Sequence, residues 1–342
     1  MKAVCITAPN RYEQIDLPMP EINDYQCLVR TRACALCNAT DNEIINHTFT
    51  LGSPYWYPLL LGHEGAGEIV EIGEKVRNYA VGEHVINPES HLIKSESYYC
   101  PYGGQFVEYT VVTDAAAAQA DGVNLPQKTH GAKKVSAQIP FVDAAAMVSL
   151  CEMLSGLHNM GFQPGSRVLI YGDGSNGAGL ASLARLLGAD WVGVAGHHDG
   201  RLRHIKSCGK VDEVYNTKDC DISGVIPPRS LDLVIDAAGR SRLLIEGSKL
   251  VRIGGTFALY AILGDEDCMV NLNEIAMHIN VFKNCLPYGN MAVVGELEGL
   301  ILSGKMRPSD IYSHVLPVEE FGKALEMTRS REAIKVVLTF DG

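Results

Sequence analysis

Features that mark several common classes of protein are missing from this chain of 342 residues. Its 29 Lys and Arg residues are outnumbered by 40 Asp and Glu residues, so the formal net charge is -11 and a nucleic-acid partner is not expected. No uninterrupted apolar run reaches the roughly 20 residues of a membrane-spanning helix, and the start, MKAVCITAPNRYEQ, lacks the apolar core of a secretory signal. We therefore expect a cytoplasmic protein with a small-molecule partner and no membrane partner.

The chain is too long for one ordinary hydrophobic core, so two domains are expected. From about residue 24 to residue 113, short strand-like runs are broken by Gly, Pro and Asn, which indicates an antiparallel, barrel-like domain. From about residue 166, apolar runs such as SRVLIY, DWVGVA and LDLVID alternate with helix-like segments, which indicates a doubly wound parallel sheet. The last run, AIKVVLTF, is expected to fold back onto the first domain. Residues 115–134 show neither pattern and are predicted to form an exposed loop or lid.

A glycine-rich turn follows the predicted strand SRVLIY and precedes a helix-like segment. Glycines at such a turn let the backbone approach a pyrophosphate, which then lies at the positive end of the next helix. The spacing is G-x-G-x-x-G, and its context of strand, turn and helix is the one that a dinucleotide site requires. The residues predicted to bind the cofactor here are Gly172, Gly174, Ser175, Asn176 and Gly177.

Gly196 follows the next predicted strand, Trp191 to Ala195, where the adenosine ribose is expected to bind. An NAD enzyme places Asp or Glu there, so its absence at this position removes a charge that would repel a 2'-phosphate. His197, His198 and Arg201 can supply positive charge or hydrogen bonds to that phosphate. We therefore expect NADP(H) to be preferred over NAD(H). In an alternative interpretation these are surface loop residues, and Asp199 binds the ribose from a shifted register.

Residues 62–73 read GHEGAGEIVEIG, which matches G-H-E-x-x-G-x5-G. This is the zinc signature of the medium-chain, zinc-containing alcohol dehydrogenases, a family that includes sorbitol, threonine and other polyol dehydrogenases. The chain resembles that family over nearly its whole length, including GGQFVEYTVV, the glycine-rich turn and the ending SREAIKVVLTF. The resemblance implies a GroES-like, mostly β, barrel-like catalytic domain over residues 1–151, completed by 289–342. It implies a Rossmann domain, with its doubly wound parallel sheet, over residues 152–288.

The resemblance also implies a catalytic zinc site near the start of the chain. Cys37 is similar to the first zinc ligand of the family because it precedes a Thr-Asp pair, Thr40 and Asp41. One extra residue intervenes, which makes Cys34 an alternative. Thr40 is implied to exchange the proton of the substrate hydroxyl, and Asp41 to hold the ring of a ligand histidine. Many relatives have a His shortly after this pair, where the chain reads Asn-Glu-Ile, so Glu43, His47 or water is left to carry the proton onward.

The remaining ligands are implied by the signature and by a later segment. His63 is similar to the second ligand, and Glu64 to the adjacent carboxylate that lies behind the zinc or binds it. The third ligand is Cys151 or Glu152. Counting back from Ser155 and His158 favours Cys151, whereas similarity to polyol dehydrogenases supports Glu152. A catalytic zinc takes about three such ligands and keeps one position open for substrate.

Relatives often carry a second zinc in a lobe with four closely spaced cysteines, but residues 88–104 contain only Cys100. We therefore expect one zinc per chain. The function that follows is oxidation of a secondary alcohol, polyol or sugar-like, to a ketone, by an enzyme that forms a homodimer or homotetramer as relatives commonly do. Two alternatives are a zinc-free enoyl or quinone reductase of the same superfamily and a non-catalytic NADPH-binding protein.

Overall fold

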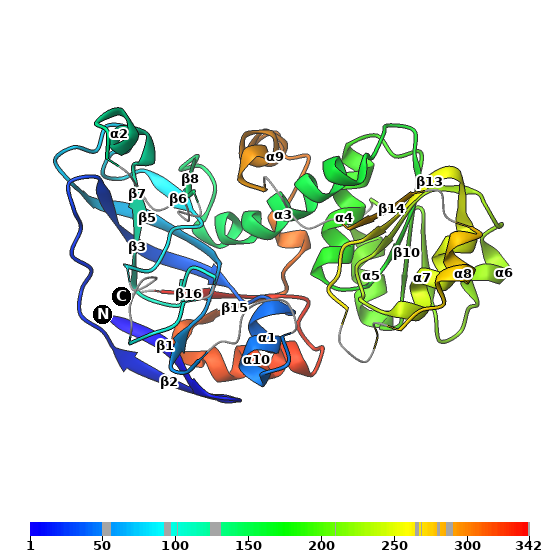
Figure 1. Ribbon diagram of the computed structural model, residues 1–342, viewed down its shortest axis with the longest axis horizontal. Coiled ribbons are helices and arrows are strands. Elements are labelled where there is room, and N and C mark those ends of the chain that lie inside the picture. The colour runs from blue at the N-terminus through cyan, green and yellow to red at the C-terminus, as the bar shows by residue number, and fades with distance from the viewer. Residues whose placement is uncertain are drawn as a thin grey trace. The chain divides into compact units, whose positions relative to one another are not determined.

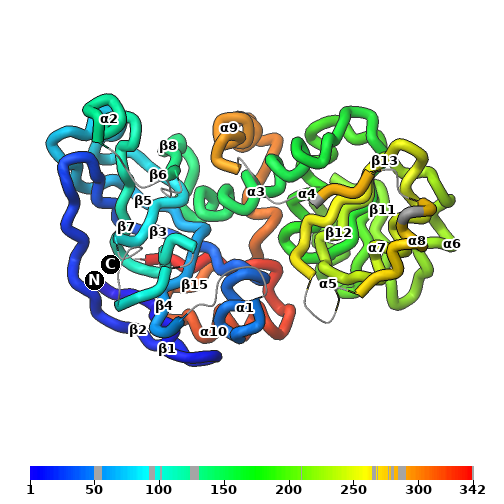
Figure 2. The backbone as a smooth tube through the Cα atoms, in the orientation of Figure 1, coloured from blue at the N-terminus to red at the C-terminus, as the bar shows by residue number. Residues whose placement is uncertain are grey.

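The computed structural model describes residues 1–49, 56–91, 97–100, 102–123, 131–208, 210–263, 267, 269–278, 281–284 and 290–340. Contacts within the chain divide it into two compact units. The first unit comprises residues 1–148 and 312–342, and the second comprises 149–311. In Figure 2 the blue beginning and the red end of the chain belong to the same unit. The predicted two-domain α/β architecture is confirmed.

The first unit is mostly β structure. Its elements are β1 (Lys2–Ala8), β2 (Arg11–Asp16), β3 (Gln26–Ala35), α1 (Thr40–Asn46), β4 (Leu59–Leu60), β5 (Glu64–Ile72), β6 (His84–Ile86), β7 (Tyr109–Thr113), α2 (Ala115–Ala120), β8 (Lys133–Val135), β15 (His314–Pro317), α10 (Phe321–Arg329) and β16 (Val336–Thr339). The main sheet has the order β15-β16-β3-β5-β6-β8, with β7 also paired to β3, and a smaller sheet has the order β2-β1-β4. The central strand β3 is antiparallel to β5, β7 and β16.

The end of the chain supplies part of the core of this unit. Phe321 of α10 packs edge-to-face on Phe106, with ring centroids 5.5 Å apart, and both rings are fully buried. Ile44 and Ile45 of α1 belong to the same cluster. Burying each large apolar side chain contributes about 1.5 to 3 kcal/mol. The C-terminal segment is therefore an integral part of the first unit.

The second unit contains one parallel sheet with helices on both faces (Figure 1). Its elements are β9 (Arg167–Tyr171), α4 (Ser175–Leu186), β10 (Trp191–Gly196), α5 (Asp199–Ser207), β11 (Glu213–Asn216), α6 (Ile222–Val225), β12 (Leu231–Asp236), α7 (Ser241–Leu250), β13 (Val251–Leu259), α8 (Leu272–Ala276), β14 (Val281–Asn284) and α9 (Val294–Leu302). The strand order is β11-β10-β9-β12-β13-β14, so the chain moves outward from β9 in both directions. The central strands are buried on both faces, as their continuous apolar sequences require.

A long helix, α3 (Phe141–Met160), belongs to both units by residue number, since the border lies between residues 148 and 149. It is the one described helix that is long and apolar enough to cross a membrane by length and composition. Of its apolar window, 72% is buried inside the protein. Its composition is therefore that of a core helix.

Two boundaries differ from the sequence predictions. The second unit extends to Ile311, beyond the expected border at 288. The segment after α9 contacts α5 and the chain that follows it. The carbonyl of Asp310 lies 2.8 Å from Nε2 of His204, and Lys210 donates to the carbonyl of Lys305.

The alanine run expected in a loop or lid instead forms α2. Asp114 caps this helix by accepting from the backbone N–H of Ala117 at 3.0 Å, and alanine has the highest helix propensity. Residues 124–130 of that predicted lid lie outside the described residues.

Candidate active site

The last residue of β3 and the first residues of its neighbours β5 and β16 lie together where these three strands meet the same end of the main sheet. Ala35, the last residue of β3, lies opposite Glu64 of β5 on one side and Val337 of β16 on the other. Because β3 is antiparallel to both neighbours, the chain leaving β3 meets the chain entering β5 and β16. Cys37, just after β3, and Lys335, just before β16, are thereby brought to the same edge as Glu64.

The glycines of the GHEGAGEIVEIG segment permit this close arrangement. Gly62 has a φ of +93°, and a Cβ there would lie 2.9 Å from the backbone nitrogen of Phe106. A Cβ on Gly67 would lie 2.4 Å from the carbonyl oxygen of Arg30 on β3. Both positions therefore require glycine, the first for its backbone conformation and the second for the packing of β5 on β3.

Asp41 connects Cys37 to His63. Its side chain is fully buried in the first turn of α1, and its Oδ2 accepts from the backbone N–H of Cys37 at 2.9 Å. Its Oδ1 lies 3.5 Å from Nδ1 of His63, and neither of these two buried atoms has a hydrogen-bond partner among the described residues. Burial lowers the pKa of His63, but the charges of Asp41 and Cys37 outweigh burial and hold that pKa well above its ordinary value. The site therefore favours a positive charge.

Cys37, His63 and Glu64 each offer one ligand atom, and these three atoms lie within 4.8 Å of one another. Cys37 is a half-buried free thiol. Cys34, the alternative first ligand, is fully buried on β3, outside this cluster, and burial raises the pKa of its thiol well above the ordinary value. The structure thus groups Cys37, and not Cys34, with the other two residues.

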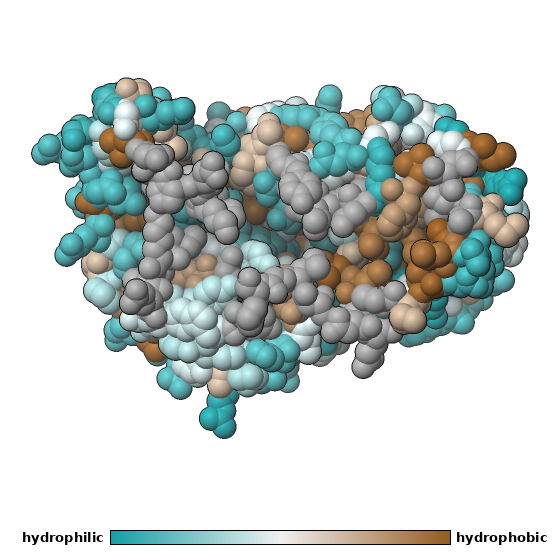
Figure 3. Space-filling model, in the orientation of Figure 1, coloured by the Kyte–Doolittle hydropathy of each residue, from teal (hydrophilic) through white to brown (hydrophobic). Residues whose placement is uncertain are grey.

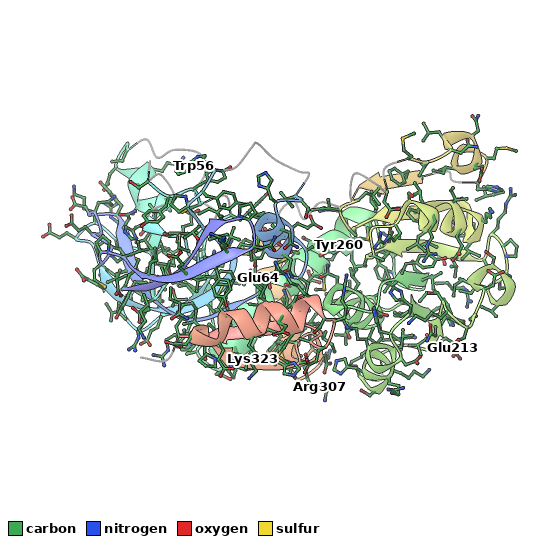
Figure 4. The ribbon with its side chains drawn as sticks, turned by 90° about the horizontal axis from the view of Figure 1, so that it is seen from below. Trp56, Glu64, Glu213, Tyr260, Arg307 and Lys323 are labelled. Carbon is green, nitrogen blue, oxygen red and sulfur yellow. The ribbon has the colours of Figure 1, made fainter. Side chains whose placement is uncertain are left out.

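Lys335 was not identified from the sequence, although it contacts Glu64 directly. Its Nζ lies 2.7 Å from Oε1 and 2.5 Å from Oε2 of Glu64, and both side chains are almost completely buried. Figure 4 shows Glu64 inside the first unit. The pair joins residues 271 positions apart, and its sequence signal was a single basic residue in the apolar run AIKVVLTF.

Thr40 begins α1 and is half-buried. Glu43 follows three residues later, so it lies on the same side of the helix, and burial raises the pKa of its carboxyl. His47 is exposed just after α1, with Nδ1 3.3 Å from the hydroxyl of Tyr57. Glu43 is therefore a titratable group on the same side of α1 as Thr40.

The two residues predicted for the third ligand lie on α3, in the part that belongs to the second unit. Cys151 is fully buried, and burial raises the pKa of its thiol to about 12. Glu152, the next residue, is half-buried.

The glycine-rich turn joins β9 to α4 in the second unit. Gly172 has a φ of +132°, and its N–H donates to the carbonyl of Ala195 at the end of β10. A Cβ on Gly177 would lie 1.8 Å from the carbonyl oxygen of Gly172, so only glycine fits there. Gly174 is the N-cap of α4, and the helix begins with Ser175 and Asn176. The turn thus has the form that the phosphate-binding prediction required.

The predicted ribose-binding residues occupy the end of β10 and the start of α5. Gly196 is buried at the strand end, His197 is exposed, and His198 is the N-cap of α5. Arg201 is buried on the inner side of α5, which leaves the two histidines as the more accessible groups. Asp199, the alternative ribose ligand, accepts from Nδ2 of Asn216 at 2.6 Å.

Asp173, within the glycine-rich turn, also reaches the end of β10, which the sequence analysis did not foresee. Its Oδ2 accepts from the backbone N–H of His197 at 2.8 Å, so a carboxylate lies at the end of β10 although Gly196 carries none. The available signal was a charged residue between the first two glycines of the turn.

Comparisons with known proteins agree with this geometry. The family described as alcohol dehydrogenase GroES-like domain matches residues 23–127, and the family described as zinc-binding dehydrogenase matches 177–297. The chain is 26% identical to L-threonine 3-dehydrogenase of Bacillus licheniformis over 94% of this chain and 93% of the relative. It is 24% identical to D-arabinitol dehydrogenase 1 of Uromyces fabae over 99% and 97%.

A solved structure from Sinorhizobium meliloti 1021, assigned as a zinc-binding dehydrogenase and bound to NADP, has the same fold. Its TM-score is 0.80, its identity is 21%, and 99% of each chain is covered. The chain therefore belongs to the zinc-type medium-chain alcohol and polyol dehydrogenases. It is an enzyme of the alcohol dehydrogenase type, from a family that uses zinc and a nicotinamide cofactor.

Replacing Lys335 with Met should lower the free energy of unfolding by about 3 to 5 kcal/mol, because Glu64 would keep a buried charge without its cation. The double variant Glu64→Gln/Lys335→Met should recover most of that loss, since a neutral amide needs no counter-charge. Urea denaturation at pH 7 of metal-free protein measures both. A loss below about 1 kcal/mol in the single variant would show that the pair is not held as a buried ion pair.

Proposed function

We propose that this chain interconverts a secondary alcohol and a ketone by hydride transfer with NADP(H) at one catalytic zinc. The observation that carries the proposal is the cluster of Cys37, His63 and Glu64, with ligand atoms within 4.8 Å of one another. The names of two relatives specify L-threonine and D-arabinitol, and each compound carries a secondary hydroxyl beside other polar groups. A polyol or sugar-like substrate is consistent with that chemistry.

A zinc ion fits the residues at this site. Thiol sulfur, imidazole nitrogen and carboxylate oxygen are the ligand types that zinc takes, and the buried negative groups favour a cation. With Nδ1 of His63 facing Oδ1 of Asp41, the ring nitrogen left to bind a metal is Nε2. Because Lys335 holds both oxygens of Glu64, we propose that Cys37 and His63 are permanent ligands and that Glu64 lies behind the ion.

For the third ligand we propose Glu152. Its half-buried side chain is better suited to a site that admits substrate than the fully buried side chain of Cys151. This choice reverses the preference obtained by counting back from Ser155 and His158.

The chain's own residues position the reactants and move the proton. When bound, zinc supplies a Lewis acid that polarises the substrate oxygen, and the nicotinamide accepts or donates the hydride. In the oxidation direction we propose that the hydroxyl of Thr40 accepts the proton of the substrate hydroxyl while it passes its own proton to Glu43, on the same side of α1, or to water. Asp41 keeps His63 in one tautomer, and the N–H of Cys37 fixes Asp41 in turn.

The ligand cluster separates this proposal from its two rivals. A zinc-free enoyl or quinone reductase has no use for a thiol and an imidazole aligned by a buried carboxylate. A non-catalytic NADPH-binding protein would tolerate the loss of Cys37 or His63. Both residues are present and grouped, which supports the zinc-dependent reaction.

The preference for NADP(H) is supported by His197 and His198, which can donate to a 2'-phosphate at the end of β10, where Asp173 also places a carboxylate. One charge-assisted contact to the 2'-phosphate should favour NADPH over NADH by at least about tenfold in kcat/KM. Steady-state rates with each cofactor measure this preference.

We further propose that the enzyme is a cytoplasmic homo-oligomer. The edge of the parallel sheet at β14 and the neighbouring α8 carry exposed apolar side chains, and Figure 3 shows apolar atoms gathered on the second unit. The residues are Met269, Leu272, Met277 and Phe282. Phe282→Lys should shift the molar mass measured by light scattering toward that of one chain, and a wild-type protein already at that mass would exclude the assembly.

The wild-type enzyme should contain about one zinc per chain, and His63→Ala should lose both the metal and the activity while it keeps the fold. His158→Ala, which changes an exposed imidazole on α3 paired with Glu296, serves as the control and should retain both. Elemental analysis with circular dichroism measures these outcomes. Two zinc ions per chain, or full activity without metal, would contradict the proposal.

Thr40→Val should reduce kcat by about 100-fold to 10,000-fold, because it removes a proton-transfer hydroxyl while keeping the side-chain shape. Thr40→Ser keeps the hydroxyl and should stay close to wild type. The dissociation constant for NADPH should change little in either variant. An unchanged kcat in Thr40→Val would place the proton transfer on another group.

A further inference from the structure

Asp173 is anchored at the start of α5 by backbone groups. Its side chain is 7% exposed, and its Oδ2 accepts from the N–H groups of His197 and His198, each at 2.8 Å. Burial raises the pKa of Asp173, but the hydrogen bonds from His198 and His197 outweigh burial and lower it below the ordinary value. The carboxylate is therefore ionised and can only accept hydrogen bonds.

The carboxylate also fixes the ring of His198. Nδ1 of His198 lies 3.1 Å from both oxygens of Asp173. Since an ionised carboxylate only accepts, Nδ1 carries a hydrogen, and Nε2 is the nitrogen that remains for a ligand. The side chain of His198 is 32% exposed, so the ring is accessible at the N-terminus of the nine-residue helix α5. An anion is favoured at such a helix end.

Gly196 makes room for this pair. A Cβ on Gly196 would lie 2.5 Å from both Cβ and Oδ2 of Asp173. An acid on the strand end and the acid on the turn are therefore mutually exclusive. This chain places its carboxylate on the turn, where it faces an imidazole and two N–H groups.

We propose that Asp173 is a positioning residue for cofactor choice, which holds His198 so that its Nε2 meets the 2'-phosphate of NADP(H). The inference rests on the proposed function. When the phosphate binds, the ring takes up a proton from solvent on Nε2, so that it donates to the phosphate through Nε2 while it still donates to Asp173 through Nδ1. The ring then neutralises the carboxylate that would otherwise repel the phosphate.

Neighbouring groups are consistent with this assignment. Asp199 is engaged by Asn216, and the buried side chain of Arg201 adds positive charge on the same helix. Asp173, His197 and His198 also have ligand atoms within 4.8 Å of one another, as a metal site would. However, both oxygens of Asp173 already accept from N–H groups, so the carboxylate is satisfied without a cation.

The test compares Asp173→Asn with the wild type in dissociation constants for NADPH and NADH, measured by fluorescence titration of the zinc-loaded enzyme. NADPH should bind about 10-fold to 100-fold more weakly to the variant, because the amide no longer supports the charged ring, while NADH should change less than about twofold. Arg203→Gln, which removes an exposed positive charge from the same helix α5, serves as the control and should cost NADPH clearly less. Thermal stability of both variants reports any general loss of fold.

A second background shows whether Asp173 acts through His198. His198→Arg supplies a cation that needs no holder, so adding Asp173→Asn to it should change NADPH affinity less than about twofold. Equal loss of NADPH and NADH would mean a merely structural role and would overturn the inference. Tighter NADPH binding with weaker NADH binding would overturn it in favour of Asp173 as the ribose ligand.

The wild-type measurements separate this inference from the proposed function. A wild-type enzyme that prefers NADPH, with a variant that keeps the preference, would refute the role of Asp173 alone. Binding of neither cofactor by the wild type would refute the proposed function and this inference together.

Discussion

The buried ion pair between Glu64 and Lys335 is the contact on which the arrangement of the first unit depends. It joins the start of β5 to the chain entering β16, across 271 positions in sequence. Because an almost fully buried carboxylate is costly without a cation, the pair favours the register in which both strands flank β3. That register places Cys37 at the same sheet edge as Glu64, and the ligand cluster follows from it.

Each unit also contains a carboxylate that is held by backbone N–H groups and faces an imidazole. Asp41 accepts from the N–H of Cys37 and faces His63, whereas Asp173 accepts from the backbone of the loop that carries His198. Asp41 lies in the first turn of α1, and Asp173 lies in the glycine-rich turn that precedes α4. The two imidazoles are thus oriented by the fold, one toward the metal cluster and the other at a helix N-terminus.

The parts of the site predicted from the sequence are those whose residues are close together in the chain. The glycine-rich turn could be recognised because local spacing determines its geometry, and His63 and Glu64 because they stand in one contiguous signature through which the chain resembles its family. Lys335 could not, because its role arises from strand pairing between distant segments, and one lysine in an apolar run is usual for a strand with an outward-facing side chain. Asp173 was missed because pattern reading assigns roles to the glycines of the turn and none to the residues between them. The second unit extends to Ile311 rather than to the expected 288, and the contact between His204 and the carbonyl of Asp310 has no signal in the neighbouring sequence.

The central claim is that the grouped residues Cys37 and His63 hold one catalytic zinc, completed by a carboxylate. Zinc K-edge X-ray absorption of the purified enzyme tests it most directly. The account predicts one sulfur at about 2.3 Å, with the other ligands nitrogen or oxygen at about 2.0 to 2.2 Å. A shell with two sulfurs would show that the third ligand is Cys151 and not Glu152. A zinc shell without sulfur, or with four sulfurs, would contradict the assigned site.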